Sequence, residues 1–286
     1  MNILITGHKG FVGKYFVTKY ANHNIVGIDI KDGNDVRDFF KKDFSAFDLV
    51  IHLAAIVGGR QTIEGSPISV AIDLSIDAEF FSWCLKAKPK HIIYFSSSAA
   101  YPIKYQYSNS NIKLSEDLID LDNVESPDLT YGWAKLTGEY LAKFVSHEIN
   151  TTIFRPFSGY GSDQDLSYPF PSFIKRAYEK QNPFEIWGDG TQVRDFIHIQ
   201  DIVDAVDVCV QNKITGTYNL GSGIPTSFND LANQLCDIVG YQPYILHKPS
   251  APTGVMYRVC DPTKMLNFYK PKITLEQGIN LALNSI

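Results

Sequence analysis

Tyr131 and Lys135 are the two side chains of this sequence whose types and spacing best suit chemistry. They lie four residues apart, so on a helix the phenol and the ammonium share one face. A phenol in water has a pKa of about 10, and a neighbouring ammonium favours the phenolate. The pair therefore suggests proton transfer to or from a hydroxyl near neutral pH. The same spacing also arises by chance where a packed ring lies beside a solvated amine, so the interpretation depends on other motifs.

A glycine-rich turn near the N-terminus predicts a dinucleotide-binding site. An apolar strand over residues 2–6 leads into Gly7, Gly10 and Gly13, and an amphipathic helix follows. Gly7 allows a tight turn, Gly10 lets the backbone approach a pyrophosphate, and Gly13 lets the helix pack closely on the strand. The N-terminus of the helix then faces the phosphates. Because strand, turn and helix follow in the required order, binding is favoured over a simple turn.

The second predicted strand, residues 25–29, ends at Asp29 and indicates that the dinucleotide is NAD. In such folds a carboxylate about 20 residues after the first glycine binds the adenosine ribose. A 2′-phosphate would meet a like charge there, although Lys31 could soften this exclusion. Capping of the next turn is the alternative role of Asp29. The polar turn over residues 34–38 could receive the adenine edge or be a solvated loop.

Composition excludes several classes of partner. The chain has 286 residues, of which 44% are hydrophobic and 20% charged, as in a soluble globular protein. Its net charge of −5 offers no basic patch for nucleic acid, no apolar run is long enough for a bilayer, and no signal peptide is recognisable. We therefore expect a cytoplasmic protein that binds small molecules or a second copy of itself, with no nucleic acid and no membrane.

Scattered cysteines and histidines argue against a disulfide framework and a metal site. The four cysteines show no C-x-x-C spacing and the seven histidines no ligand spacing, so we predict reduced thiols and no metal. His52 and His198 lie in apolar strand-like runs, where each is expected to be a satisfied core histidine.

Alternation of strand-like and helical patterns predicts an α/β fold with a doubly wound parallel (Rossmann) sheet. The strand-like runs are residues 2–6, 25–29, 48–53, 91–96 and 151–155. Ligands bind beyond the carboxyl ends of such strands, where the glycine turn and Asp29 both lie. After residue 156, prolines and glycines mark an irregular region.

Two domains are expected from this pattern. Residues 1–157 with 191–220 are predicted to form the NAD-binding domain, and a strand-like run over residues 216–220 could return to its sheet. Residues 158–190 with 221–286 are predicted to form a smaller α/β substrate-binding lobe. Between them, residues 101–130 form a polar segment that could be a flap over the site.

Two long predicted helices, residues 67–86 and 131–148, carry apolar residues on more than one face. This is expected if they also pack on a second subunit, so we predict a homodimer. Packing of the same residues on the core of their own chain is the alternative.

Serine hydroxyls follow the predicted strand over residues 91–96. A serine there can hydrogen-bond the oxygen that loses its proton to Tyr131, while Lys135 and a positive nicotinamide ring stabilise the phenolate. Together these groups would form an alcohol-oxidation site. The alternative is that the serines only end a strand and begin a turn.

Taken together, these motifs resemble the extended short-chain dehydrogenase/reductase superfamily, in particular its NAD-dependent sugar-nucleotide epimerases and dehydratases. The resemblance extends over nearly the whole chain and includes the segments 52–55, 155–161, 187–198, 219–223 and 258–262. It implies NAD as cofactor and a nucleoside-diphosphate sugar as substrate. It also implies catalysis by Ser97 as hydroxyl partner, Tyr131 as general acid/base and Lys135 as the residue that holds the nicotinamide ribose.

The resemblance also implies the binding residues. The residues expected to bind the cofactor are Gly7, Gly10, Phe11, Val12, Gly13, Asp29, Ile30, Asp35, Val36, Leu53, Ala54, Ala55, Ser96, Tyr131, Lys135, Pro156 and Phe157. Those expected to bind the substrate are Val57, Gly58, Ser97, Ser98, Tyr131, Ser158, Trp187, Arg194 and Arg258. Both arginines would bind the diphosphate, because a guanidinium fits phosphate oxygens in a bidentate way. A surface ion pair is the alternative role for either arginine.

Departures from the family pattern narrow the expected reaction. Dehydratases and decarboxylases of the family carry an acid where Ser98 and Ala99 stand, and 3,5-epimerising members use a cysteine in place of Ala99. The segments 54–59 and 100–102 look like the branch that acts on GDP-sugars, while Ser158 replaces an asparagine that commonly contacts the substrate. We therefore predict a sugar-nucleotide epimerase, an isomerase that works through a transient 4-keto intermediate. A 4-keto reductase or dehydratase and a catalytically idle NAD sensor are the alternatives.

Overall fold

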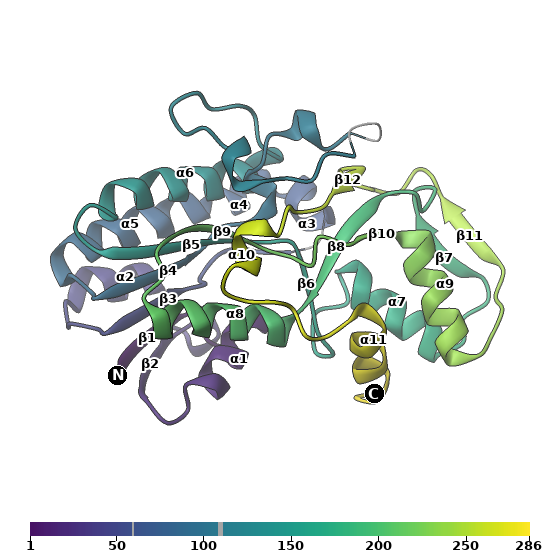
Figure 1. Cartoon of the computed structure of the whole chain (residues 1–286), viewed down its shortest axis with the longest axis horizontal. Coiled ribbons are helices and arrows are strands. Elements are labelled where there is room, and N and C mark those ends of the chain that lie inside the picture. Colours follow the sequence, from purple (N-terminus) through teal and green to yellow (C-terminus); the bar gives the residue numbers. More distant parts are fainter. Residues whose placement is uncertain (59, 108–110) are drawn as a thin grey trace.

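A parallel sheet forms the centre of the computed structural model, which describes residues 1–58, 60–107 and 111–286 (Figure 1). Its six strands, in spatial order, are β2 (Asn24–Ile28), β1 (Asn2–Thr6), β3 (Leu49–His52), β4 (His91–Phe95), β5 (Asn150–Pro156) and β9 (Gly216–Leu220). Every neighbouring pair runs parallel. The predicted doubly wound sheet is confirmed, and the run over residues 216–220 does return to it as an edge strand.

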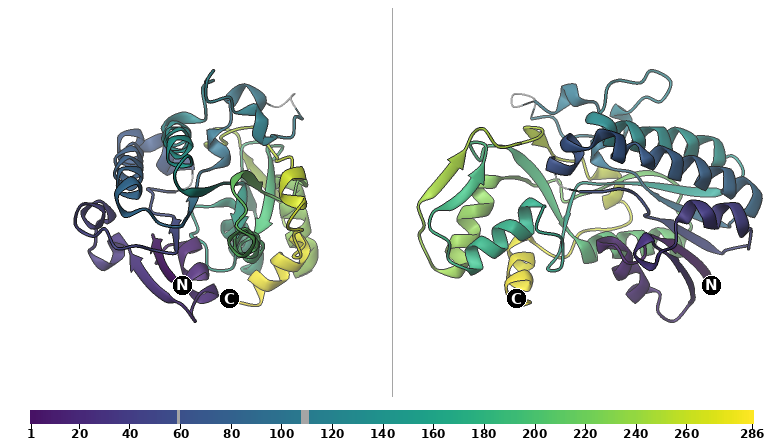
Figure 2. Two further views of the ribbon diagram at one scale, coloured as in Figure 1. Left: turned by 60° about the vertical axis from the view of Figure 1, so that its left-hand side comes forward. Right: turned by 180° about the vertical axis from the view of Figure 1, so that it is seen from behind.

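Helices cover both faces of the sheet because its strands are apolar on both sides. Ile3 and Ile5 of β1 pack in the core with α1 (Phe11–Lys19) and α8 (Ile199–Asn212), whereas Leu4 between them packs with helices of the opposite face. Those opposite helices are α2 (Val36–Lys42), α5 (Ile72–Ala87) and α6 (Leu129–Val145). The views from the side and from behind show the same three layers (Figure 2).

Helix boundaries differ from the predicted ones in one region. The single helix expected over residues 67–86 is divided into α4 (Pro67–Val70) and α5, with α3 (Arg60–Gly65) before them. Ala71 lies between α4 and α5, and its N–H still donates to backbone oxygens of the preceding turn. The second long helix, α6, begins and ends slightly earlier than the predicted 131–148.

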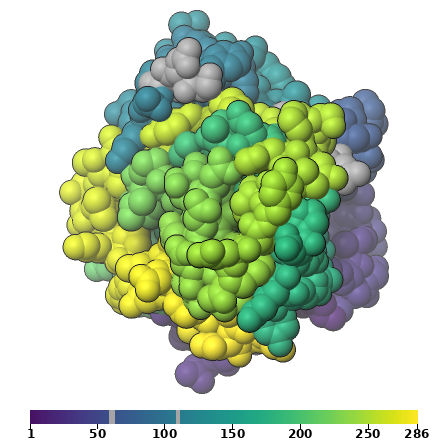
Figure 3. All heavy atoms as spheres, turned by 90° about the vertical axis from the view of Figure 1, so that its right-hand side faces the viewer, coloured from purple at the N-terminus to yellow at the C-terminus, as the bar shows by residue number. Residues whose placement is uncertain are grey.

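A smaller lobe with its own core lies beyond the sheet, at the end of the molecule that faces the viewer in Figure 3. Its elements are α7 (Pro169–Tyr178), β7 (Phe184–Trp187), α9 (Phe228–Val239), β11 (Ile245–Lys248) and α11 (Leu275–Leu283). Ser227 and Thr274 begin α9 and α11 with reciprocal capping boxes, which satisfy the first backbone N–H groups of both helices.

Strand β8 (Val193–His198) lies outside the six-stranded sheet. It pairs with the short strands β6 (Ser158–Tyr160), β10 (Pro225–Ser227) and β12 (Tyr257–Arg258). The remaining short elements are η1 (Ile30–Asp32), η2 (Ser98–Ala100), η3 (Ile103–Tyr105), η4 (Glu116–Leu118) and α10 (Thr263–Leu266).

A buried ion pair joins the sheet to α6 and to the segment that follows β4. The Nε and Nη2 atoms of Arg155 in β5 donate to the carboxylate of Glu139 in α6 over 2.9 and 2.6 Å. Ser96 also donates to Glu139, and the Nη1 atom of Arg155 donates to the Tyr101 hydroxyl (3.1 Å) and the Glu116 carbonyl (3.0 Å). These bonds satisfy both buried charges, as a low-dielectric interior requires.

Asn219 extends this polar network to β9, the edge strand beside β5. Its side-chain oxygen accepts from the Tyr101 hydroxyl over 2.7 Å, and its backbone N–H donates to the Glu116 carboxylate over 2.8 Å. Its side-chain amide donates to the carbonyls of Leu114 (2.8 Å) and Asp261 (3.1 Å). The segment predicted as a flap, residues 101–130, is therefore anchored to the sheet at these points, with residues 108–110 outside the described part.

Removal of the buried Arg155 guanidinium should destabilise the folded protein. Arg155→Met leaves Glu139 buried without its cation, so we expect the free energy of unfolding to fall by about 3–5 kcal/mol in urea denaturation. Lys143→Met is the matched control, because Lys143 forms an exposed ion pair with Asp122 (2.9 Å) whose loss should leave the free energy of unfolding almost unchanged. Equal losses in the two variants would contradict the assigned role of the buried pair.

Candidate active site

The three predicted catalytic residues lie together where β4 and α6 meet. Ser97 follows β4 and lies close enough to the Tyr131 phenol to lower its pKa, while the Ser97 Oγ accepts from the backbone N–H of Ala99 over 3.1 Å. The Lys135 ammonium lies 5.9 Å from the centre of the Tyr131 ring and 5.4 Å from that of Tyr94. Lys135 is buried, whereas Tyr131 keeps partial exposure to solvent. The arrangement can move a proton at a hydroxyl that enters from the solvent side.

Close packing at Gly132 lets the start of α6 approach the serine turn. A Cβ on Gly132 would lie 2.4 Å from the carbonyl oxygen of Ala99, a distance that excludes any larger residue. The backbone N–H of Asp128 also donates to that carbonyl over 3.0 Å. The contact fixes Tyr131 beside Ser97.

Two opposing effects act on the Tyr131 phenol. Burial raises the pKa of Tyr131, Lys135 lowers it, and Asp73 raises it again, so that the pKa lies above its ordinary value. The sequence predicted only the lowering by Lys135. The structure adds the loss of hydration and a nearby carboxylate, neither of which the spacing of Tyr131 and Lys135 reveals.

Two aspartates of α5 balance the charge of Lys135. Burial by itself lowers the pKa of Lys135, but Asp77, Tyr131 and Asp73 raise it above the ordinary value, so the ammonium is retained. Asp77 and Asp73 are four residues apart in α5 and hence lie on one face. Neither aspartate was among the residues predicted for the site, although their spacing of four residues was an available signal.

His52 supports Asp77 from the centre of the sheet. Its Nε2 lies 3.2 Å from the Asp77 carboxylate and its Nδ1 2.8 Å from the Thr6 hydroxyl, while Tyr94 donates to the other oxygen of Asp77 over 2.5 Å. Burial lowers the pKa of His52, which keeps the imidazole neutral. The expectation of a satisfied core histidine is confirmed.

The glycine turn has the geometry that a dinucleotide requires. Gly7 has a φ of 71°, and a Cβ on Gly13 would lie 2.2 Å from the carbonyl oxygen of Gly7. Gly10 is the N-cap of α1, whose first residues Phe11 and Val12 pack on the core. The backbone of the turn and the N-terminus of α1 are thus available to phosphates.

Asp29 has the capping role that the sequence left open, and it keeps acceptor positions for the other proposed role, which is ribose binding. Its carboxylate accepts from the backbone N–H of Lys9 over 2.8 Å and from that of Lys31 over 2.9 Å, so it caps the next turn. A carboxylate has about four acceptor positions, so both oxygens can still accept from ribose hydroxyls. The position at the end of β2, beside the glycine turn, fits NAD.

The other predicted cofactor residues line the same edge of the sheet. The N–H groups of Leu53 and Ala54 donate to the Thr6 hydroxyl over 3.1 and 3.2 Å, which holds the loop with Ala55 beside the glycine turn. Asp35 caps α2 and pairs with Arg37 over 2.5 Å.

Several predicted cofactor residues have side chains that are used elsewhere. Val36 belongs to the core, the Ser96 hydroxyl donates to Glu139, and Phe157 packs against Tyr101. The Ile30 side chain is 69% exposed. At Val36, Ser96 and Phe157, and at Pro156 at the end of β5, a ligand would therefore contact the backbone rather than the side chain.

Arg194 and Arg258 lie side by side on the strands β8 and β12, where they are register partners. Arg194 donates to the carbonyls of Val193 (2.8 Å) and Thr253 (3.2 Å). Arg258 pairs with Asp128 over 2.7 Å. Residues in register on parallel strands project from the same face, so the two guanidinium groups can act on one anion.

The remaining predicted substrate residues differ in their exposure to solvent. Val57 is 58% exposed and Trp187, at the end of β7, is 38% exposed. Ser98 is buried in η2, and Ser158 is partly exposed at the start of β6. Gly58 is partly exposed, whereas Gly59, which completes the segment 54–59, lies outside the described residues.

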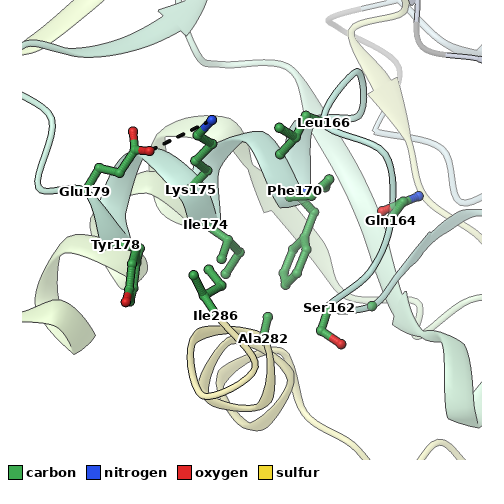
Figure 4. A pocket seen from close by; sticks show the side chains of 12 residues that line it. Ser162, Gln164, Leu166, Phe170, Ile174, Lys175, Tyr178, Glu179, Ala282 and Ile286 are labelled. Atoms are coloured by element: carbon green, nitrogen blue, oxygen red, sulfur yellow. Dashed lines mark ion pairs between the residues drawn. The ribbon is translucent and has the colours of Figure 1, made fainter.

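Two cavities contain none of the predicted site residues. One of about 250 Å³ lies between α7 and α11, with Phe170 and Ile174 in its wall and an ion pair of Lys175 and Glu179 at its rim (Figure 4). The other, of about 560 Å³, lies beside the buried pair of Glu139 and Arg155.

Within residues 1–58, 60–107 and 111–286, every helix is too short or too polar to cross a membrane. Over the same residues, no group of three or more His, Cys, Asp or Glu side chains is arranged to hold a metal ion. All four cysteines are free thiols and buried.

Comparisons with known proteins agree with this geometry. Residues 3–221 match the NAD dependent epimerase/dehydratase family. Among curated relatives, the GDP-L-colitose synthase of Yersinia pseudotuberculosis is 26% identical, with 98% of this chain and 96% of the relative covered. The putative UDP-glucose 4-epimerase of Methanocaldococcus jannaschii is 27% identical, with 99% and 97% covered.

Solved structures show the same fold over the whole chain. The UDP-glucose 4-epimerase of Thermotoga maritima, solved with UDP-glucose, has a TM-score of 0.84 and 24% identity, with 99% of this chain and 98% of that chain covered. The UDP-glucuronic acid 4-epimerase of Bacillus cereus, solved with UDP-glucuronic acid and NAD, has a TM-score of 0.82, 25% identity and the same coverage. This chain therefore belongs to the NAD dependent epimerase/dehydratase family, a family of sugar-nucleotide epimerases, reductases and dehydratases, and its cofactor is NAD.

Proposed function

We propose that the protein is a sugar-nucleotide epimerase that inverts C4 through a transient 4-keto intermediate. The observation that carries the proposal is the assembled set of Ser97, Tyr131 and Lys135 with Ala99, which has no acid or thiol, buried beside it. Oxidation at C4 and its reversal need only this set and NAD, whereas loss of water needs a further acid.

Each residue has a defined task in this reaction. When bound, NAD would supply the acceptor and the donor of the hydride that leaves C4 and comes back to it. The Tyr131 phenolate takes the proton of the C4 hydroxyl, Ser97 hydrogen-bonds the same oxygen, and Lys135 stabilises the phenolate. On return, Tyr131 gives its proton back to the C4 oxygen, so hydride and proton balance over the cycle.

The diphosphate of the substrate is proposed to bind at the paired arginines. Arg194 and Arg258 project from the same face of β8 and β12, and two guanidinium groups suit the charge and shape of a diphosphate. Asp128 partly neutralises Arg258, so we assign the larger share of the attraction to Arg194.

A 4-keto reductase is the second candidate, because several full-length relatives are named as synthases or reductases. One of them, the dTDP-4-dehydro-6-deoxy-D-allose reductase of a Streptomyces species, is 26% identical with 92% of this chain covered. The same three catalytic residues would then give a proton to a keto oxygen while reduced cofactor is consumed.

The experiment that tests the proposal is incubation of the NAD-loaded protein with UDP-, GDP-, dTDP- and CDP-sugars, followed by NMR of the products. We expect two C4 epimers to interconvert without net oxidation of NADH. Products of water loss or decarboxylation alone would overturn the epimerase, and net consumption of NADH would replace it with the reductase. NAD binding without turnover of any sugar would favour the idle sensor.

Tyr131→Phe should abolish most turnover and leave NAD binding intact. Removal of a general acid/base typically costs about 10²–10⁴-fold in rate, and the ring is retained, so packing is preserved. The rate is measured by NMR with the sugar that reacts, and NAD affinity by calorimetry. Tyr244→Phe in the smaller lobe, where the ring is 69% exposed, is the matched control and should keep full activity. Retained activity in Tyr131→Phe would exclude this tyrosine as the base.

We also propose that two copies associate through α5 and α6. Trp133, Tyr140 and Phe144 form an exposed aromatic stripe on α6, with exposed fractions of 45, 43 and 56%. Their spacings of seven and four residues place them on one face, directed away from the core of the chain. Ile72 and Leu85 of the neighbouring α5 are also partly exposed. Apolar surface of this kind favours a second, identical helix pair.

A charge within the aromatic stripe should separate the copies. We expect light scattering to give twice the 32.1 kDa chain mass for the unmodified protein and a single chain mass for Phe144→Glu. Tyr244→Glu is the control, since Tyr244 is 69% exposed in the smaller lobe and should leave the dimer unchanged. A monomer before any substitution would exclude this association.

A further inference from the structure

Asp73, in the first turn of α5, is a buried carboxyl group that the proposed chemistry does not use. It is 1% exposed, and one of its oxygens accepts from the backbone N–H of Ile56 over 2.6 Å. Among the described residues, its Oδ2 atom has no hydrogen-bond partner. A buried carboxyl oxygen without a hydrogen-bond partner lowers the stability of the fold, so a functional reason for an aspartate at position 73 is expected.

The surroundings of Asp73 connect it to the Tyr131 and Lys135 pair. Helices α5 and α6 pack together, and the Lys135 ammonium and the Tyr131 phenol of α6 interact electrostatically with Asp73, as does Asp77 of its own helix. Asp77 is fully engaged by His52 of β3 and Tyr94 of β4, and a further carboxylate, Glu139, acts on Lys135 from α6. Within the described part of the chain, Asp73 is thus the carboxyl group near Lys135 that has an oxygen without a hydrogen-bond partner.

The charge of Asp73 changes within the physiological range. Burial raises the pKa of Asp73 to about 6, although Lys135 and the Ile56 N–H act in the opposite direction. The carboxylate is present above that pH and is lost as the pH falls through it. While it is present, it raises the pKa of Tyr131, so the charge of Asp73 opposes the effect of Lys135.

Asp73 also holds the loop that follows β3. Ile56 comes directly after Ala54 and Ala55, whose backbone lies against the glycine turn, and before the exposed Val57. One carboxyl group therefore touches the loop at the proposed cofactor and substrate sites and acts electrostatically on the proposed base.

We propose that Asp73 is a positioning residue that fixes the loop over residues 54–58 and, through its charge, sets how readily Tyr131 gives up its proton. This inference rests on the proposed role of Tyr131 as acid and base. An epimerase needs both forms of Tyr131, because the proton taken in the first half of the cycle is returned in the second. A carboxylate that offsets part of the effect of Lys135 keeps the protonated form available.

The experiment uses Asp73→Asn, which keeps an oxygen for the Ile56 N–H and removes the charge. Tyrosine labelled with ¹³C at Cζ reports ionisation of the phenol by NMR, and Tyr131 is assigned as the resonance missing in Tyr131→Phe. In the NAD-bound protein we expect the titration midpoint of Tyr131 in Asp73→Asn to fall by about one pH unit. Asp122→Asn, at an exposed position near the end of α6, is the matched control and should leave the midpoint unchanged.

The NMR titration needs no turnover, so its outcome is independent of the epimerase proposal. If the protein is active, the rising limb of kcat/KM against pH should move to lower pH by the same amount as the NMR midpoint. An unchanged Tyr131 midpoint in Asp73→Asn, with an unaltered thermal unfolding midpoint, would overturn the inference. So would a loss of thermal stability with no change in the Tyr131 titration, since that result would assign Asp73 a structural role alone.

Discussion

The buried ion pair of Glu139 and Arg155 holds together the segments on which the site depends. Glu139 belongs to the helix that carries Tyr131 and Lys135, and Arg155 belongs to strand β5 of the central sheet. The same two side chains bind Ser96, next to Ser97, and the start of the polar segment at Tyr101. Because neither charge can be buried without the other, the helix, the strand and the serine turn take one relative position. The distance between the phenol and the serine hydroxyl follows from that position.

A second constraint is the charge balance around Lys135. One ammonium interacts with the buried carboxylates of Asp73, Asp77 and Glu139 and with the partly exposed Tyr131 phenol. Glu139 is neutralised by Arg155, and Asp77 is held by the neutral His52 and by Tyr94. The balance keeps Lys135 protonated while burial keeps Tyr131 protonated in the ligand-free protein. Further positive charge beside Tyr131, such as an oxidised nicotinamide, would favour the phenolate.

Much of this molecule was predictable because its strongest signals are local. The glycine turn, the acid at the end of the second strand and the Tyr131 and Lys135 spacing each need only one strand, turn or helix to be recognised. The strand runs were correct to within a few residues, and the return of residues 216–220 to the sheet was foreseen. The break at Ala71 was missed, since the apolar pattern continues from α4 into α5 and Ala favours helices. Asp73 and Asp77 were missed as well, because an acid on a helix ordinarily indicates a solvated face.

The sequence by itself determined the family, the cofactor and the residue ranges of the main strands, because these follow from turn chemistry and hydrophobic periodicity along contiguous residues. Only the tertiary structure decided which charges surround the base. Asp73, Asp77, Glu139 and Lys135 come from different turns of α5 and α6, and their effect on Tyr131 depends on burial and on distances between those helices. A pKa reports the sum of hydration and all nearby charges, so no single spacing in the chain can give it. The pairing of Arg194 with Arg258 likewise depends on two strands that are distant in sequence and adjacent in the fold.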